Sequence, residues 1–360
     1  MSADGATWPL PPVVSLSDLG DLGPAVAAGG GQSVGIHALA NYPGWLLKKY
    51  KTSDANGGVT RLDGLVAFPM TVPDDDRTLL RNHTSWPVAR LTGAAGHCLG
   101  CVIPVAPATF RAAIPIGGES SERYLEVDWL AKPDDSLRSR GLPVPSPLER
   151  RKVCRSIVAV AALLERHRFV YSDWSYSNAF WSTSDLSAYV IDVDGCWVTS
   201  VPNVFQPNWD DPLTPRSDRA DVYTDRYRVA LLVGRCITGL RDRVAMLHKL
   251  VVLKDSALGD LLLDILLARE RTRRPSTTAL LAVLDGLPYF RIPLERKPLP
   301  PEPTGVVPVP TVSVRPPAVS SGPAATGTPT PATRVAVGVL VGVFVFIVLV
   351  LLVVIFASSG

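Results

Sequence analysis

The sequence predicts an α+β fold in two lobes, a small β-rich N-terminal lobe and a larger helical C-terminal lobe. Residues 21–132 contain short apolar runs broken by Gly, Pro and Asp, a pattern typical of a small sheet with one helix. Apolar residues at helical spacing dominate residues 133–296. Residues 1–20 are punctuated by Pro and Ser and are expected to form a loose lead-in. A proline-rich linker and one C-terminal transmembrane helix complete the expected chain.

Helices in the second lobe are indicated by their starts and their apolar spacing. Residues 146–149 read Ser-Pro-Leu-Glu, in which Ser caps the helix, Pro suits its first position and Glu completes a capping box. This helix is expected to continue to about Arg166. The apolar spacing predicts further helices at about 225–239, 250–268 and 276–284.

Residues 297–334 change composition sharply. Eleven of these 38 residues are proline and none is aromatic. Such a segment cannot bury an apolar core, so we expect a disordered, extended and semi-rigid linker.

The apolar stretch at residues 335–357 predicts a membrane anchor. Its 23 residues carry no charge, and at about 1.5 Å per residue a helix of this length spans roughly 34 Å. Residues 358–360 are expected on the far side. Arg334 borders the span on its N-terminal side, which favours a cytoplasmic location for the preceding residues. Gly338 and Gly342 form a GxxxG pair through which two such helices could dimerise.

Composition excludes several other functional classes. The net charge is +3 and only 19% of residues are charged, so nothing indicates a nucleic-acid partner. The five cysteines are odd in number and scattered, which argues against a disulfide framework. Cys98 and Cys101 form half of a zinc motif whose other half is missing, so reduced structural thiols are expected.

Three residues in one stretch give the strongest indication of chemistry. Asp173 and Asn178 lie five residues apart in a loop-like segment, and Asp192 follows a strand-like run at 188–191. This set suits metal-assisted phosphoryl transfer. One carboxylate orients the attacking hydroxyl, and the amide and the second carboxylate hold Mg²⁺ against the nucleotide phosphates.

The stretch resembles the catalytic loop and Asp-x-Gly turn of protein kinases. Over about residues 20–290 the layout resembles divergent bacterial membrane-anchored Ser/Thr protein kinases of actinobacterial type. The resemblance implies a bilobal protein-kinase-like fold with ATP and Mg²⁺ as cofactors. It also implies that Asp173 is catalytic and that Asn178 and Asp192 are metal ligands.

The resemblance extends to the nucleotide-binding end. Gly29, Gly30 and Gly31 lie where kinases carry a glycine-rich phosphate loop, although the pattern is one residue short of GxGxxGxV. Lys48 ends a strand-like run and matches the lysine that pairs with the α- and β-phosphates. No glutamate follows Lys48 until Glu119, so Asp63 is the best-placed acid to pair with it.

Several positions depart from the family pattern. Tyr171 and Ser172 precede Asp173 where the family has His-Arg, and Ser175 replaces a lysine that steadies the γ-phosphate in kinases acting on proteins. Asp194 is expected either to extend the metal site or to support its turn. Both possibilities stay open.

Two downstream features resemble structural parts of the kinase fold. Asp225, counted back from Gly239, matches a buried aspartate that braces the catalytic loop backbone. Arg274 matches an arginine that pairs with a buried acid. The sequence Trp-Asp-Asp-Pro at 209–212 occupies the place of the family's Ala-Pro-Glu and matches it poorly.

The expected function is therefore transfer of the γ-phosphate of ATP to Ser or Thr hydroxyls at the cytoplasmic face of a membrane. The linker, with its Thr and Ser residues, is a candidate substrate of the same chain because it can fold back at high effective concentration. Three alternatives remain: a membrane-tethered pseudokinase scaffold, a small-molecule phosphotransferase of the same fold, and a tail-anchored structural protein that binds no nucleotide.

Overall fold

The computed structural model describes residues 7–28, 33–51, 58–93, 96–116, 119–203, 206–290 and 295–301. All of them fall within one compact unit, Met1–Gly305. The predicted glycine loop at 29–31, the linker from residue 302 onward and the predicted anchor at 335–357, with Gly338 and Gly342, lie outside the described residues. Within the described part of the chain, no helix is both long and apolar enough to cross a membrane.

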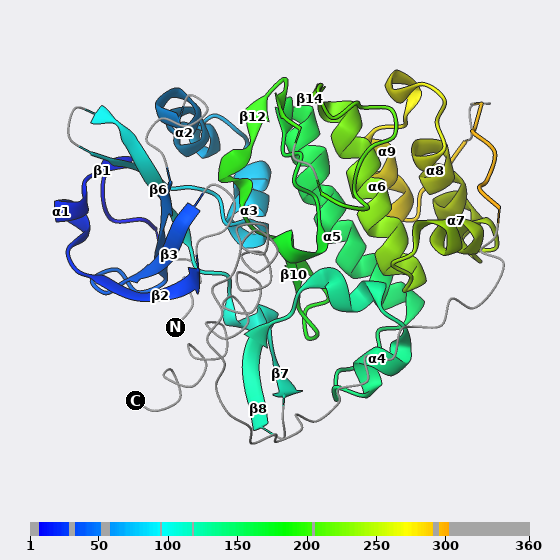
Figure 1. Cartoon of the computed structure of the whole chain (residues 1–360), viewed down its shortest axis with the longest axis horizontal. Coiled ribbons are helices and arrows are strands. Elements are labelled where there is room, and N and C mark those ends of the chain that lie inside the picture. Colours follow the sequence, from blue (N-terminus) through cyan, green and yellow to red (C-terminus); the bar gives the residue numbers. More distant parts are fainter. Residues whose placement is uncertain are drawn as a thin grey trace, which may run out of the picture. The chain divides into compact units, whose positions relative to one another are not determined.

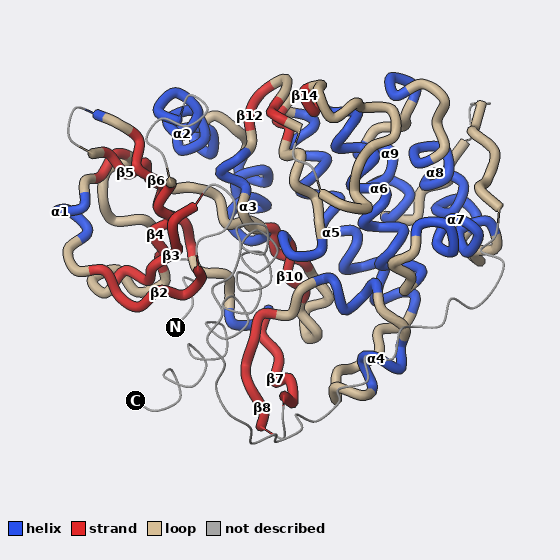
Figure 2. The backbone as a smooth tube through the Cα atoms, viewed as in Figure 1, coloured by secondary structure: helices blue, strands red, loops and turns tan. Residues whose placement is uncertain are grey.

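The fold is α+β, with a β-sheet N-terminal region and a helical C-terminal region, as predicted (Figure 1). Figure 2 shows the strands of the main sheet gathered on one side and the long helices on the other. The sheet has six strands in the order β1-β5-β6-β4-β3-β2. Their bounds are β1 Val13–Val14, β2 Leu22–Ala28, β3 Ser33–Leu39, β4 Trp45–Tyr50, β5 Ala89–Thr92 and β6 Cys98–Pro104. All neighbouring strands are antiparallel except β1 and β5, which are parallel.

The prediction of a loose lead-in at 1–20 is wrong for its second half. β1 adds an edge strand to the sheet, and α1 (Leu16–Leu19) follows it with a capping box between Ser15 and Asp18. Val14 and Leu19 are 1% and 0% exposed, so they belong to the apolar core of the sheet. The Pro- and Ser-containing residues 11–20 therefore form short ordered elements, because the buried side chains of Val14 and Leu19 anchor them in the core.

Two ten-residue helices lie between β4 and β5, where the sequence indicated one. α2 (Gly58–Ala67) contacts the sheet at β5 and β6, and α3 (Asp74–His83) contacts α5 and β11 of the helical region. A hairpin of β7 (Arg111–Ile116) and β8 (Glu119–Tyr124) follows β6 and projects from the body in Figure 1. The sequence did not predict this hairpin.

The helical region is built around α5, and its long helices are α5 Pro147–Arg166, α6 Val222–Thr238, α7 Arg243–Val251, α8 Ser256–Leu266 and α9 Thr277–Leu284, after the short α4 Asp134–Arg138. α5 contacts α6 and α9, and α6 also contacts α7 and α8. The predicted start of α5 is confirmed, since the Ser146 hydroxyl accepts from the Glu149 amide and the Glu149 carboxylate accepts from the Ser146 amide.

Two helix boundaries differ from the prediction. α6 begins three residues early, because the Asp221 side chain caps it by accepting from the amides of Tyr223 and Thr224. The single helix predicted at 250–268 is wrong. The chain breaks between α7 and α8, where the Asp255 side chain accepts from the Leu258 amide and starts a new helix. Continuous apolar spacing concealed this break.

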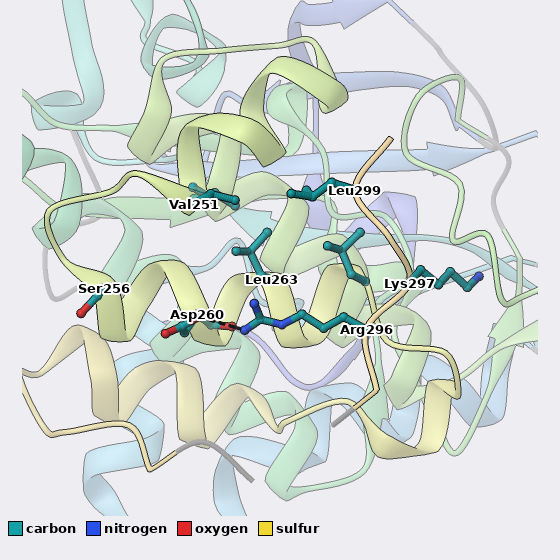
Figure 3. Close-up of a pocket in the computed structure, with 9 residues that line it drawn as sticks. Val251, Ser256, Asp260, Leu263, Arg296, Lys297 and Leu299 are labelled. Atoms are coloured by element: carbon teal, nitrogen blue, oxygen red, sulfur yellow. Dashed lines mark hydrogen bonds and ion pairs between the residues drawn. The ribbon is translucent and has the colours of Figure 1, made fainter. Parts of the chain in front are cut away.

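The segment 295–301 lies against the helical region rather than starting a free linker at residue 297. Its backbone bridges Arg296 to Ala268, and the Lys297 amide donates to the Leu267 carbonyl at 2.6 Å. The Arg296 guanidinium reaches Asp264 at 2.7 Å and Asp260 at 3.0 Å, as Figure 3 illustrates for Asp260. A cavity of about 360 Å³ lies between this segment and helices α7 and α8. Leu299 is one of the residues that line it. The prediction is therefore wrong for residues 297–301.

Candidate functional site

A small hairpin brings two predicted metal ligands together. β10 (Ala179–Trp181) pairs with β11 (Ala188–Val190), so that Asn178 precedes one strand and Asp192 follows the other. The Ile191 amide donates to the Asn178 carbonyl at 2.9 Å and extends the pairing to this end. The alternating ladder thus places Asn178 beside the turn that begins at Asp192.

A second pair of short strands supports the same region. β9 (Phe169–Val170) precedes the loop that contains Asp173, and β12 (Trp197–Val198) follows the turn that begins at Asp192. The two strands pair in antiparallel fashion. Together with the β10–β11 hairpin, this ladder fixes both ends of the candidate site. The site residues were predicted from the sequence, but the two-residue strands β9 and β12 were not.

The loop that contains Asp173 is braced from α6. The buried carboxylate of Asp225 accepts from the backbone amides of Tyr171 and Ser172 at 2.7 and 2.8 Å. Arg228, one helical turn later, donates to the carbonyl and the hydroxyl of Ser172. Asp225 therefore has the bracing role predicted for it.

Two residues of the site hold the left-handed backbone conformation. Ser172 and Asp192 have φ values of 62° and 62°. Such a conformation is unfavourable for residues other than glycine and persists only where the surroundings enforce it. Around Ser172 that enforcement comes from Asp225 and Arg228, which bond its amide, carbonyl and hydroxyl. The site is thus held in a shape that the local sequence alone would not favour.

Lys48 comes from the sheet region and meets this site across 144 residues of sequence. It lies on β4, between β3 and β6, and its side chain is 9% exposed. Its ammonium contacts the carboxylate of Asp192 and lies 2.7 Å from that of Asp194. Burial lowers the pKa of Lys48, but the two carboxylates outweigh burial and leave the pKa above its usual value. The lysine is therefore a fixed positive charge.

Asp194 also contacts Lys48, and its role was left open by the sequence. Its second carboxylate oxygen accepts from the Tyr50 hydroxyl at 2.6 Å, so Asp194 bonds two residues of β4. Burial raises the pKa of Asp194, but Lys48 and Tyr50 hold it below its usual range. For Asp192, burial and the neighbouring Asp194 outweigh Lys48 and raise the pKa.

The assignment of Asp63 as the acid that pairs with Lys48 is wrong. Asp63 accepts from the Arg90 guanidinium of β5 at 2.7 and 3.4 Å, whereas Lys48 pairs with Asp192 and Asp194. The acids that pair with Lys48 do not come from the helix after β4 but from the turn after β11. The sequence Asp-Val-Asp at 192–194 was the feature that could have indicated a second acid near Lys48.

The predicted catalytic carboxylate, Asp173, is half-buried and partnered. Its backbone carbonyl accepts from the Asn178 side-chain amide at 2.8 Å, and its carboxylate accepts from the Gln206 amide. Burial and the charge of Asp192 raise the pKa of Asp173 to about 6. The sequence did not single out Gln206, since nothing local distinguishes it from other loop residues.

The residues beyond the loop form a second buried anchor. Arg274 binds both oxygens of Asp211 at 2.6 and 2.6 Å, and both side chains are 1% exposed. The expected pairing of Arg274 with a buried acid is confirmed. Its acid lies in the 209–212 stretch that matched the family poorly, with aspartate in place of glutamate.

The donor set at Asn178 and Asp192 suits a hard cation. The Asn178 amide nitrogen donates to the Asp173 carbonyl, and among the described residues no hydrogen bond engages the amide oxygen, which can act as a ligand. Carboxylate and amide oxygens are ligands that Mg²⁺ accepts, with nucleotide phosphates supplying the rest. Among the described residues, no group of three or more His, Cys, Asp and Glu could hold a metal ion by itself. All five cysteines are buried.

Two cavities in the described part of the chain lie elsewhere. One has about 360 Å³ and lies under segment 295–301, and the other has about 630 Å³ and is lined by Trp45, Trp86 and Tyr189 among others. Neither is lined by Lys48 or Asp192.

A scan against models of known protein families found no match, and a search of curated proteins found none either.

Proposed function

We propose that this chain is a phosphotransferase with a bilobal protein-kinase-like fold, which transfers the γ-phosphate of ATP to a Ser or Thr hydroxyl with the help of Mg²⁺. The observation that carries the proposal is the contact of Lys48 with Asp192. A lysine of a central sheet strand and an acid of a distant turn meet at the place where nucleotide phosphates would be bound between them.

Each residue of the site has a role in this proposal. Lys48 binds the α- and β-phosphates by charge. Asn178 and Asp192 would hold Mg²⁺, which neutralises negative charge on the phosphates when bound. Asp173 accepts a hydrogen bond from the acceptor hydroxyl and orients its oxygen toward the γ-phosphate. The glycines at 29–31 are proposed to cover the phosphates with backbone amides.

The bracing of the Asp173 loop supports the same reaction. Phosphoryl transfer depends chiefly on positioning and on charge, with little covalent chemistry for the protein to perform. Asp225 and Arg228 hold the backbone at Ser172, and the β10–β11 hairpin holds Asn178 beside Asp192. Such a network of rigid supports suits a site that must keep a carboxylate and two ligand oxygens in fixed relation.

The membrane and the substrate enter as parts of the proposal. A helix at 335–357 would tether the domain to the cytoplasmic face of a cell membrane, with possible pairing through Gly338 and Gly342. The linker at 302–334 is a candidate acceptor because tethering gives it a high effective concentration at the site.

One contact favours a second candidate, a pseudokinase that binds nucleotide without transferring phosphate. The Gln206 side-chain amide donates a hydrogen bond to the Asp173 carboxylate, which the acceptor hydroxyl would otherwise bind. Ser175, in the place of the lysine expected of kinases acting on proteins, is 6% exposed and contacts the Ser177 hydroxyl at 3.2 Å.

Thermal unfolding with nucleotide and a transfer assay separate these functions. The full-length chain is heated with ATP, with MgCl₂ and with both, and γ-labelled ATP is then offered with a generic Ser/Thr protein substrate and with a metabolite extract. Stabilisation by Mg-ATP together with labelled protein supports the proposal. Stabilisation without transfer would identify a pseudokinase, and label in metabolites alone would identify a small-molecule phosphotransferase. No stabilisation and no transfer would contradict all three.

A further inference from the structure

The helix that follows β4 in sequence, α2, carries a buried charge of the wrong sign to pair with Lys48. The face of α2 turned inward consists of Gly58, Arg61, Leu62 and Leu65. Arg61 is only 7% exposed, and its Nε is buried without an acceptor among the described residues. An active phosphate-binding lysine of this kind needs an acid partner to hold it in place. The inward face of α2 offers an arginine instead.

The acid comes from the turn after Asp192. Asp194 lies 2.7 Å from the Lys48 ammonium and 2.6 Å from the Tyr50 hydroxyl, and its side chain is 5% exposed. The charge of Arg61 acts on the same carboxylate from the α2 side. One buried carboxylate thus lies among a lysine of β4, a tyrosine of β4 and an arginine of α2.

The two carboxylates that share Lys48 differ in access to solvent. The side chain of Asp192 is 42% exposed, whereas that of Asp194 is almost fully buried. Asp194 also has a second bond to Tyr50 that would be lost if it moved, and a buried carboxylate without partners is costly. Asp192 is therefore the acid that can exchange partners, and Asp194 is the one that stays.

We infer that Asp194 is the positioning residue of Lys48: it holds the ammonium at the phosphate site from the turn itself, in the place that a helix glutamate would take. Asp192 is thereby released to bind Mg²⁺ while Lys48 keeps a partner. This inference rests on the proposed function, since it assigns Asp194 a role in nucleotide binding at that site.

Two consequences distinguish this arrangement from a merely structural ion pair. Without Asp194, Asp192 is the only acid in the described part of the chain that still pairs with Lys48, so Mg²⁺ must compete with the lysine for that carboxylate. In addition, the partner of Lys48 lies two residues from Asp192 and moves with the turn, so a displacement of α2 alone does not separate the pair.

Nucleotide binding with and without metal tests the assignment in the full-length chain. The dissociation constant of fluorescently labelled ATP is measured in EDTA and then across a MgCl₂ titration for the wild type, Asp194→Asn, Lys48→Met and the double variant. Asp63→Asn is the matched control, because Asp63 lies on α2 and bonds Arg90.

We expect Asp194→Asn to weaken binding in EDTA about tenfold and to raise the half-saturating Mg²⁺ concentration about tenfold. The double variant should bind no more weakly than Lys48→Met, because Asp194 acts through the lysine. Tyr50→Phe, which keeps the carboxylate but removes one donor, should give a smaller loss of about twofold to fivefold. If Asp194→Asn does not unfold cooperatively and is therefore not properly folded, Tyr50→Phe replaces it as the test.

The outcomes separate this inference from the function on which it rests. A wild type that binds no labelled ATP overturns the proposed function and the inference with it. If the wild type binds and both Asp194→Asn and Tyr50→Phe match Asp63→Asn, only the inference is overturned. Losses of Asp194→Asn and Lys48→Met that simply add would also overturn it, since they would indicate a structural role.

Discussion

The carboxylate of Asp225 accepts hydrogen bonds from two backbone amides of the loop next to Asp173. Burial raises its pKa to about 7, against the opposing effect of those two amides and of Arg228. A folded-state pKa above the unfolded value means that the folded chain holds an extra proton between about pH 4 and pH 7. The stability that this proton supplies is present below about pH 4 and lost as the pH rises through 7.

Asp225→Asn should therefore flatten the dependence of stability on pH. Between pH 5 and pH 8 the unfolding free energy of the wild type should fall more than that of the variant, by on the order of 2 kcal/mol. Urea denaturation at several pH values measures both slopes, and the comparison cancels the other titrating groups. Identical slopes would mean that the buried carboxyl does not take up the proton.

The pairing of Arg274 with Asp211 makes a second prediction at this scale. Both side chains are buried, so Arg274→Ala leaves a buried carboxylate without its positive partner, bonded only to the Leu213 amide and the Thr214 hydroxyl, and should cost about 3–5 kcal/mol of unfolding free energy. Arg273→Ala is the matched control, because Arg273 is 71% exposed and lies 3.7 Å from Glu270. That control should change stability by less than about 1 kcal/mol. Equal effects of the two variants in urea denaturation would refute the anchor.

Individual residues were predictable where their spacing carried the information. Asp225 and Arg274 were found by counting from a glycine and from a short motif, and their contacts agree with the expectation. Asp194 was seen but not assigned, and Gln206 was missed. Both depend on chain segments that meet only after folding, which no local pattern reveals.

At the scale of elements, short local motifs set where several helices begin. Side-chain caps start α5, α6 and α8 at Ser146, Asp221 and Asp255. The capping box of α5 was legible because Ser and Glu stand at fixed offsets. The break before α8 was not, since apolar residues continue across it with helical spacing. The hairpin of β7 and β8 was also missed, although the two residues between its strands are Gly117 and Gly118, a pair typical of two-residue hairpin turns.

The segment 295–301 gives the prediction that belongs to this scale. Arg296→Ala removes the bonds to Asp260 and Asp264 that hold the segment to α8. Hydrogen exchange of the Lys297 amide, which donates to the Leu267 carbonyl, should then accelerate about tenfold. Affinity for labelled ATP should stay unchanged, because the segment lies away from Lys48.

Arg269→Ala is the control for that change, since Arg269 is 58% exposed and lies 3.5 Å from Glu295 of the same segment. It should leave the exchange of peptides covering 295–301 within about twofold of the wild type. Unchanged exchange in Arg296→Ala would show that apolar packing of Leu299, drawn in Figure 3, holds the segment by itself.

Across the whole molecule, charges of the sheet region and of the helical region meet at the candidate site. Lys48 and Tyr50 come from β4, and Asp192 and Asp194 come from the turn after β11. The α+β division and the order of its regions followed from composition and periodicity, because these are properties of long stretches. The identity of the contacting acids did not, because it depends on how two distant segments approach each other.

The measurement that tests the central claim most directly compares the full-length wild type with Asp173→Asn in an assay with γ-labelled ATP, MgCl₂ and a Ser/Thr protein substrate. Asp185→Asn is the control, an exposed acid that contacts a neighbouring serine hydroxyl. We predict that the wild type and the control transfer label to protein, and that Asp173→Asn lowers the rate at least about 100-fold while still binding ATP. Equal labelling by the wild type and Asp173→Asn would contradict the account.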